Sequence, residues 1–162
     1  MKTRKYNYIG KDISNIKKEL ISNSFGYYKE DGTPVPYWKT PDEYVDEYGF
    51  DRTVVDSDGV YCRTVELPLG KMICRFGNRQ GRLTTDVGTA YTQLALPYKP
   101  ETVEYHEYRV IADGVKVQCF VKKGKVAPMF NSKGGGIQYL HSNTIMWEVL
   151  NHKLEEDFAW LN

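Results

Sequence analysis

The sequence has little that would direct it to a membrane, to nucleic acid or to a cysteine-rich fold. None of its apolar runs approaches the roughly 20 residues that a membrane-spanning helix needs. The formal net charge is only +1, which disfavours nucleic acid as a partner, because nucleic-acid binders of this size are usually more basic. The three cysteines are odd in number and lack Cys-x-x-Cys spacing, so we expect buried thiols without disulfides or a metal.

The chain also lacks a signal peptide at its start. The basic segment Met1–Lys5 is followed by polar residues rather than by an apolar core, so we expect no export by a classical signal. Repeats and low-complexity tracts are absent too. What is present is an ordinary globular composition, with 41% hydrophobic and 27% charged residues over 162 residues, enough for one domain with a core.

The first third of the sequence favours helices separated by loops. Isoleucines and leucines recur at spacings of three and four over residues 12–22, as in an amphipathic helix. A second helix is predicted from Thr40, where Thr40-Pro41-Asp42-Glu43 forms a capping box, to Gly49. Its inward face would carry Tyr44, Val45 and Tyr48.

From Val60 onward the sequence favours short strands. Asp113-Gly114 between the apolar runs 105–112 and 115–121 predicts a β-hairpin. Residues 142–150 predict a helix capped by Ser142 or Asn143, with Ile145, Val149 and Leu150 facing inward. Residues 154–160 predict a final element that is either amphipathic or a strand at the edge of the sheet. We therefore predict an α+β protein: a helical portion (1–58) preceding and packing on a small antiparallel β-sheet core with a ligand cleft (59–162).

Two glycine-bearing motifs predict a pocket. Gly134-Gly135-Gly136-Ile137-Gln138-Tyr139 places a glutamine after a turn that brings backbone close to a ligand. Arg75-Phe76-Gly77, on a separate segment, supplies a planar cation suited to phosphate. Together these motifs indicate a site for a polar small molecule that bears phosphate.

Eight short motifs in order resemble the tuberculosis necrotizing toxin family, over roughly Leu67 to Glu156. They are Leu69-Gly70, Arg75-Phe76-Gly77, Gly81, Gly88-Thr89, Ala95-Leu96-Pro97, Tyr105-His106-x-Tyr108-x-Val110, Ala127-Pro128-x-Phe130 and the glycine-rich string. The resemblance implies an enzyme, an NAD⁺ or NADP⁺ glycohydrolase that releases nicotinamide and ADP-ribose and needs no cofactor. It also implies a secreted or delivered toxin that acts in the cytosol of a target cell, with an immunity protein as partner and neither nucleic acid nor membrane.

The resemblance also implies roles for individual residues. Arg75 matches the arginine that binds the dinucleotide phosphates, and Gln138 matches a glutamine needed for activity. The other residues expected at the substrate are Phe76, Leu83, His106, Gly135, Gly136 and Tyr139.

Several of these residues have structural interpretations of equal or greater weight. Core packing is favoured for Phe76, a structural hydrogen bond suits His106, and the glycines suit a turn with positive φ. Leu83 replaces a common pocket aromatic of the family, and Leu94 stands where an arginine often precedes the Ala-Leu-Pro run.

The remaining titratable residues give weaker signals. Asp86, before a glycine turn, is the nearest candidate for a catalytic carboxylate, although a structural role is favoured. His141 and His152 are predicted to lie on the surface.

Two other functions stay open: ADP-ribosyl transfer to a protein, and a module of this fold that binds or interacts without catalysis. The hydrolase interpretation requires Arg75 and Gln138 to line one crevice.

Overall fold

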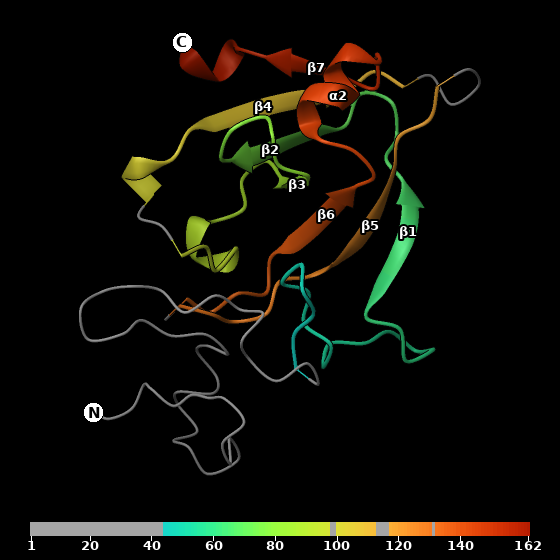
Figure 1. The fold of residues 1–162 in the computed structure, drawn as a ribbon, viewed down its shortest axis with the longest axis vertical. Coiled ribbons are helices and arrows are strands. Elements are labelled where there is room, and N and C mark those ends of the chain that lie inside the picture. Colours follow the sequence, from blue (N-terminus) through green and yellow to red (C-terminus); the bar gives the residue numbers. More distant parts are fainter. Residues whose placement is uncertain (1–43, 98–99, 113–116, 131) are drawn as a thin grey trace. The chain divides into compact units, whose positions relative to one another are not determined.

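The structure, a computed structural model, describes residues 44–97, 100–112, 117–130 and 132–162 (Figure 1). The chain divides into two compact units, described separately below. Unit 1 is Met1–Cys62, Ala90–Pro97 and Gly124–Gly136, and unit 2 is Arg63–Thr89, Tyr98–Lys123 and Ile137–Asn162. The predicted boundary between residues 58 and 59 stays a prediction, since most of the first segment lies outside the described residues.

Short strands dominate the described chain, with one α-helix and three 3-10 turns. The elements are β1 Cys62–Glu66, β2 Met72–Phe76, β3 Leu83–Asp86, η2 Tyr91–Gln93, η3 Pro100–Thr102, β4 Tyr105–Val110, β5 Phe120–Lys125, β6 Ile137–His141, α2 Ile145–Leu150, β7 Leu154–Asp157 and η4 Ala159–Leu161. This content agrees with the predicted β character of the chain from Val60 onward.

The strands form one seven-stranded sheet in the order β1-β5-β6-β3-β2-β4-β7, which can be followed in Figure 1. The pairs β2–β3, β2–β4, β3–β6 and β4–β7 are antiparallel. The predicted hairpin is wrong, because β4 pairs with β2 and β7 whereas β5 lies between β1 and β6. A turn dipeptide between apolar runs is a local signal, and here the partners of both strands lie elsewhere in the chain.

The core of unit 2 is an apolar cluster on the α2 side of the sheet. Ile73, Tyr108 and Val110 contribute to it from the centre of the sheet, and each is 0% exposed. Ile145 from α2 and Leu154 from β7 complete it from outside these strands. Burying side chains of this size stabilises the fold by roughly 1.5–3 kcal/mol each, so this cluster holds the strands in register.

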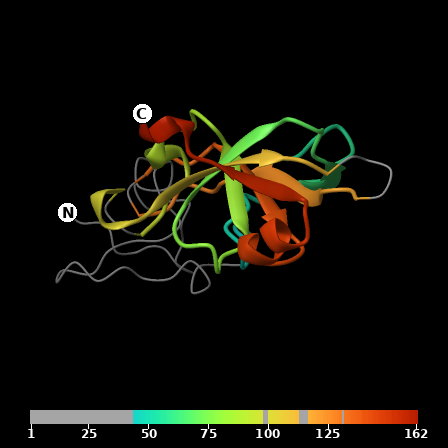
Figure 2. The ribbon, with the colours of Figure 1, turned by 90° about the horizontal axis from the view of Figure 1, so that it is seen from above.

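The helix α2 begins and ends close to the predicted position. Figure 2 shows it to one side of the strands, and it packs against β7. Thr144, rather than Ser142 or Asn143, caps it by accepting a hydrogen bond from the amide of Trp147. Ile145 is buried as predicted, but Leu150 is 69% exposed and Glu148 is buried instead. Val149 is partly buried and packs against the core cluster, as predicted, so the inward stripe is Ile145, Glu148 and Val149.

The predicted helix from Thr40 to Gly49 is wrong over its described part. Residues 44–49 form turns and an isolated bridge, Val45 to Asp51. The Asp46 carboxylate accepts hydrogen bonds from the amides of Tyr48 and Phe50, at 2.8 and 3.0 Å. This side chain thus offers the backbone an alternative to helical hydrogen bonds. The helix predicted over residues 12–22 lies outside the described residues.

Among the described residues, no helix is long and apolar enough to cross a membrane.

Candidate functional site

The register of three strands decides which candidate side chains share a face of the sheet. Gln138 on β6 stands opposite Thr85 on β3, and Thr85 stands opposite Cys74 on β2. Side chains opposite one another in adjacent strands point to the same face, and neighbours along a strand point to opposite faces. Gln138 and Cys74 therefore share one face, which we call the Gln138 face, and Arg75 points to the other, the Arg75 face.

The same rule sorts the remaining strand residues. Phe76 lies two positions beyond Cys74, and Leu83 two positions before Thr85, so both belong to the Gln138 face. His106 stands opposite Arg75, and Tyr139 follows Gln138 directly, so both belong to the Arg75 face. The strand register fixes the face from which each side chain leaves its strand, so the expectation that Arg75 and Gln138 line a single crevice stays a prediction. Each residue's contact with substrate stays a prediction.

The Arg75 side chain is held by the loop that joins β2 to β3. Its Nε donates to the carbonyl oxygen of Asn78 at 2.5 Å, and its Nη1 donates to the carbonyl oxygen of Leu83 at 3.0 Å. A Cβ at Gly81 would overlap the guanidinium, and one at Gly77 would lie 2.9 Å from Nη2. Because these two glycines have no side chain, the guanidinium fits inside the loop and fixes the main chain of residues 77–83 through its hydrogen bonds.

That loop also supports α2. The amides of Ile145 and Met146 donate to the carbonyl oxygens of Gly81 and Arg79, at 2.9 and 3.0 Å. The first amides of a helix lack partners within it, so the loop satisfies two of them. One loop therefore connects the Arg75 guanidinium to the start of the helix.

His106 sits in a charged network on the Arg75 face. Its Nδ1 contacts the Glu156 carboxylate at 2.7 Å and its Nε2 contacts Glu104 at 2.8 Å. Glu156 also pairs with Arg79, and its side chain is 8% exposed. With both ring nitrogens contacting carboxylates, the structural role anticipated for His106 is supported by its contacts.

Tyr139 and Asp86 are joined by a hydrogen bond. The Tyr139 hydroxyl donates to Asp86 Oδ1 at 2.6 Å, and Lys71 Nζ lies 3.0 Å from the same oxygen. Burial acts to raise the pKa of Asp86, but the bonds from Tyr139 and Lys71 outweigh it and lower the pKa. Burial and the bond to Asp86 raise the pKa of Tyr139. Asp86 therefore takes part in a structural hydrogen bond as a carboxylate, which is the role that its place before a glycine turn favoured.

Aromatic rings line part of the Gln138 face. Phe76 packs on Tyr105 with ring centroids 4.9 Å apart, and Trp160 meets Tyr105 edge-on at 4.9 Å. The Tyr105 hydroxyl donates to Glu107 at 2.6 Å, and burial raises the pKa of Tyr105. Phe76 therefore packs in an aromatic cluster, the interpretation favoured from the sequence.

In unit 1, the glycine string is engaged in main-chain bonds. Gly134 and Gly135 have φ of +67° and +87°, and a Cβ at Gly134 would lie 2.7 Å from the carbonyl of Ala127. The amides of Gly135 and Gly136 donate to the carbonyl oxygens of Val126 and Gln93, at 2.8 and 3.1 Å. These glycines shape the turn that precedes Gln138.

Gln138 itself is 7% exposed and lies beside Thr85, which is 1% exposed. The Thr85 hydroxyl donates to the carbonyl oxygen of Ile137 at 2.6 Å, which fixes the backbone just before Gln138. Leu94, in unit 1, is 9% exposed.

Sequence reasoning misplaced one histidine. His141 is 0% exposed, not a surface residue, whereas His152 is exposed as predicted. The last residue of β6, His141 bonds through Nε2 to the Thr84 hydroxyl at 2.8 Å. Four of the five β6 residues are buried, so strict alternation is absent from this central strand. The sequence therefore offered no periodic signal for the burial of His141.

The fold is similar to that of a solved toxin. The structure described as "tuberculosis necrotizing toxin (TNT) complexed with its immunity factor IFT" matches with a TM-score of 0.50 and 16% identity. The match covers 88% of this chain and 81% of that one. The chain therefore shares the fold of that structure. A second structure, "Rhs1-CT in complex with cognate immunity protein RhsI1", gives a TM-score of 0.45 and 16% identity over 60% of this chain and 77% of that one.

The family follows from the sequence match. The family model described as tuberculosis necrotizing toxin matches residues 66–156, more than half of the chain, and the chain belongs to this family. The comparison with curated proteins found no match.

Proposed function

We propose that this protein is a toxin that hydrolyses NAD⁺ or NADP⁺, releasing nicotinamide and ADP-ribose or its 2′-phosphate. Family membership over residues 66–156 carries this proposal, because the matched segment spans every strand residue assigned to the site. The matched fold of a solved toxin is consistent with it.

This hydrolysis needs no general acid to protonate the leaving group. The bond between C1′ of the ribose and the pyridinium nitrogen breaks with its electron pair on nitrogen, so nicotinamide leaves neutral. A water oxygen then bonds to C1′ and loses a proton to solvent. The enzyme must stabilise the positive charge that develops on the ribose, and it must leave room for one water molecule. Oriented dipoles of the protein can stabilise that charge and position the water.

Within this proposal, Gln138 is the catalytic residue. A carboxamide offers both a carbonyl acceptor and NH₂ donors, which suits it to orient a ribose hydroxyl or the attacking water. Its amide cannot act as a general base at neutral pH. Phe76 and Leu83, on the same face, would line the nicotinamide side.

Arg75 enters the proposal differently. Its bonds to Asn78 and Leu83 hold the main chain of the 77–83 loop, so it positions Leu83. Binding of the dinucleotide phosphates by its guanidinium stays a prediction, and kinetics separate the two roles. A lost phosphate contact raises KM, whereas a displaced Leu83 lowers kcat.

One partner and a place of action complete the proposal. The solved toxin of similar fold was determined with its immunity factor, and we extend an immunity protein to this chain as an inhibitor. The toxin would be delivered to a target cell and act in its cytosol.

The test is release of nicotinamide from NAD⁺ and NADP⁺, followed by chromatography. Gln138→Ala is expected to lower kcat by about 10²–10³-fold, the loss typical of removing one transition-state donor. Gln80→Ala is the matched control, because Gln80 is an exposed glutamine on the β2–β3 loop. No release by the wild type, or equal release by Gln138→Ala, contradicts the proposal.

Two further outcomes identify the rivals. Labelled NAD⁺ that marks a protein band indicates ADP-ribosyl transfer instead. Dinucleotide binding by titration without turnover indicates a non-catalytic module.

A further inference from the structure

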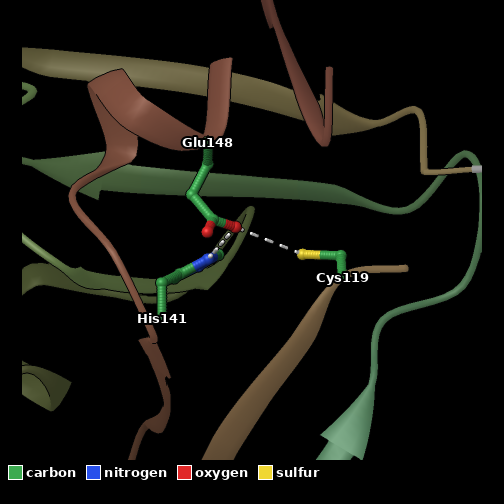
Figure 3. A group of neighbouring side chains, drawn as sticks. All are labelled: Cys119, His141 and Glu148. Carbon is green, nitrogen blue, oxygen red and sulfur yellow. Dashed lines mark hydrogen bonds and ion pairs between the residues drawn. The ribbon is translucent and has the colours of Figure 1, made fainter. Parts of the chain in front are cut away.

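Three side chains of different chemistry meet in the core of unit 2: Cys119, His141 and Glu148 (Figure 3). They are 0%, 0% and 2% exposed. Glu148 Oε1 lies 3.4 Å from His141 Nδ1 and 3.8 Å from Cys119 Sγ, and the three ligand atoms all lie within 4.8 Å of one another. No residue assigned to the NAD⁺ site belongs to this cluster.

The Glu148 carboxylate is 2% exposed, so the cost of removing its charge from water must be offset by strong contacts. Removing a charge from water costs several kcal/mol unless it is paired in good geometry. Charge-assisted N–H···O bonds are about 2.7–2.9 Å long, and a thiol is a weak donor. The contacts of Glu148 with His141 and Cys119 are both longer than that, so a cation between the three groups would compensate the carboxylate far better.

The donor set and the spacing both fit zinc. Thiolate, imidazole and carboxylate are the three ligand types that Zn²⁺ takes in proteins, at about 2.0–2.3 Å. Ligands at those bond lengths around a tetrahedral ion lie roughly 3.3–3.8 Å apart. Of the two separations, 3.4 Å lies within that range and 3.8 Å at its upper limit. The third pair, at most 4.8 Å apart, needs to close by at most about 1.5 Å.

The surroundings of His141 suit a metal ligand. Its Nε2 lies 2.8 Å from the hydroxyl of Thr84, a residue that is 3% exposed. A histidine that binds a metal through one ring nitrogen almost always donates the other N–H to a fixed acceptor. Thr84 would accept that bond and so present Nδ1 to the ion.

We propose that Cys119, His141 and Glu148 bind one Zn²⁺ ion that serves a structural role. The three ligands are buried, so a water bound in the fourth position would be enclosed and no position opens to substrate. The ion connects the residue before β5, the last residue of β6 and the centre of α2. It thereby stabilises the helix against the sheet, independently of the reaction proposed above.

The experiment uses the untagged full chain. Metal content is measured on purified protein, which is then stripped with a chelator and titrated with Zn²⁺ and with Co²⁺. We expect one zinc per chain, a lower Tm after stripping that Zn²⁺ restores, and a near-ultraviolet thiolate-to-cobalt absorption band. Less than about 0.1 zinc per chain together with no cobalt band in the wild type overturns the proposal.

Variants assign the ligands. Cys119→Ser is expected to abolish the cobalt band and to weaken Zn²⁺ binding at least about 100-fold. Glu148→Gln is expected to weaken binding and to keep the band. Cys74→Ser is the matched control, because Cys74 is also buried but lies on the Gln138 face. Binding by Cys119→Ser equal to wild type overturns the proposal. Should these variants fail to fold, the wild-type titration decides alone, with the Zn²⁺-dependent recovery of Tm after stripping as its second readout.

Discussion

The guanidinium of Arg75 occupies the space directly over Gly81 that a side chain there would need. Its two hydrogen bonds to the carbonyl oxygens of Asn78 and Leu83 depend on that space. The carbonyl of Gly81 in turn receives the first amide of α2. This one glycine therefore serves the strand β2 and the helix together.

Gly81→Ala is expected to displace the Arg75 guanidinium and to destabilise the protein by about 1–3 kcal/mol, the usual cost of overpacking. Thermal unfolding measures the loss as a fall in Tm of roughly 2–4 °C per kcal/mol. In an Arg75→Ala background the clash is gone, so the same change should cost much less. Equal costs in both backgrounds would show that the guanidinium and Gly81 are not coupled.

Thiol labelling of the native protein at pH 8 is expected to modify Cys62 alone. Burial raises the pKa of Cys74 to about 11, and Cys119 is 0% exposed and therefore closed to the reagent. At pH 8 roughly one Cys74 in a thousand is then the reactive thiolate, whereas Cys62 is only half-buried. A chromogenic disulfide reagent should count one fast thiol per native chain and three in denaturant. Rapid native modification of Cys74 would contradict its burial.

Asp86→Asn is expected to lower Tm at pH 7 and to match the wild type in acid. The folded-state pKa of Asp86 is lowered, so its carboxylate contributes stability that is fully present above the unfolded value of about 3.9. That contribution is lost as the pH falls through the folded-state pKa. Tm measured from pH 7 down to about 2.5 should show the two curves converging. Glu66→Gln, at an exposed carboxylate, is the control, and a constant gap for Asp86→Asn would disprove the linkage.

Glu156→Gln is expected to destabilise the protein by about 1–3 kcal/mol, because the amide replaces a carboxylate bonded to charged partners. Glu156 pairs with Arg79 and His106, and its side chain is 8% exposed. The neighbouring Glu155 is 57% exposed and lies 3.6 Å from Arg109, so Glu155→Gln should change stability by less than about 0.5 kcal/mol. Urea unfolding of both variants measures the difference. Equal urea midpoints for Glu156→Gln and Glu155→Gln would show that the contacts of Glu156 with Arg79 and His106 do not stabilise the protein.

Local chemistry predicted much of the secondary structure. The β character after Val60, the helix near residue 145 and the last edge element, now β7, follow from residue patterns within short windows. The motifs around Arg75 and Gln138 lie within the segment that the family matches. Strand partners could not be predicted in this way, because the Asp113-Gly114 signal says nothing about which distant strands pair with β4 and β5.

The relation between Arg75 and Gln138 depends on register, which the sequence does not specify. A shift of one residue between strands moves a side chain to the other face of a sheet. Cys74, not Arg75, stands in line with Gln138 across β3, so one position in the register decides from which face the Arg75 side chain leaves its strand. His141 was misplaced for a related reason, because a strand buried on both sides lacks the alternation that marks an inward face.

The strand β7 ends the sheet with three consecutive acidic residues, Glu155, Glu156 and Asp157. The outer edge of such a strand is a template on which a second molecule can add its own strand. Two copies meeting there would bring their Glu155 side chains, each 57% exposed, close together, and the repulsion between these carboxylates opposes fibre-like growth at neutral pH. Acidification removes that repulsion, so storage well above the titration range of carboxylates should keep the protein monodisperse.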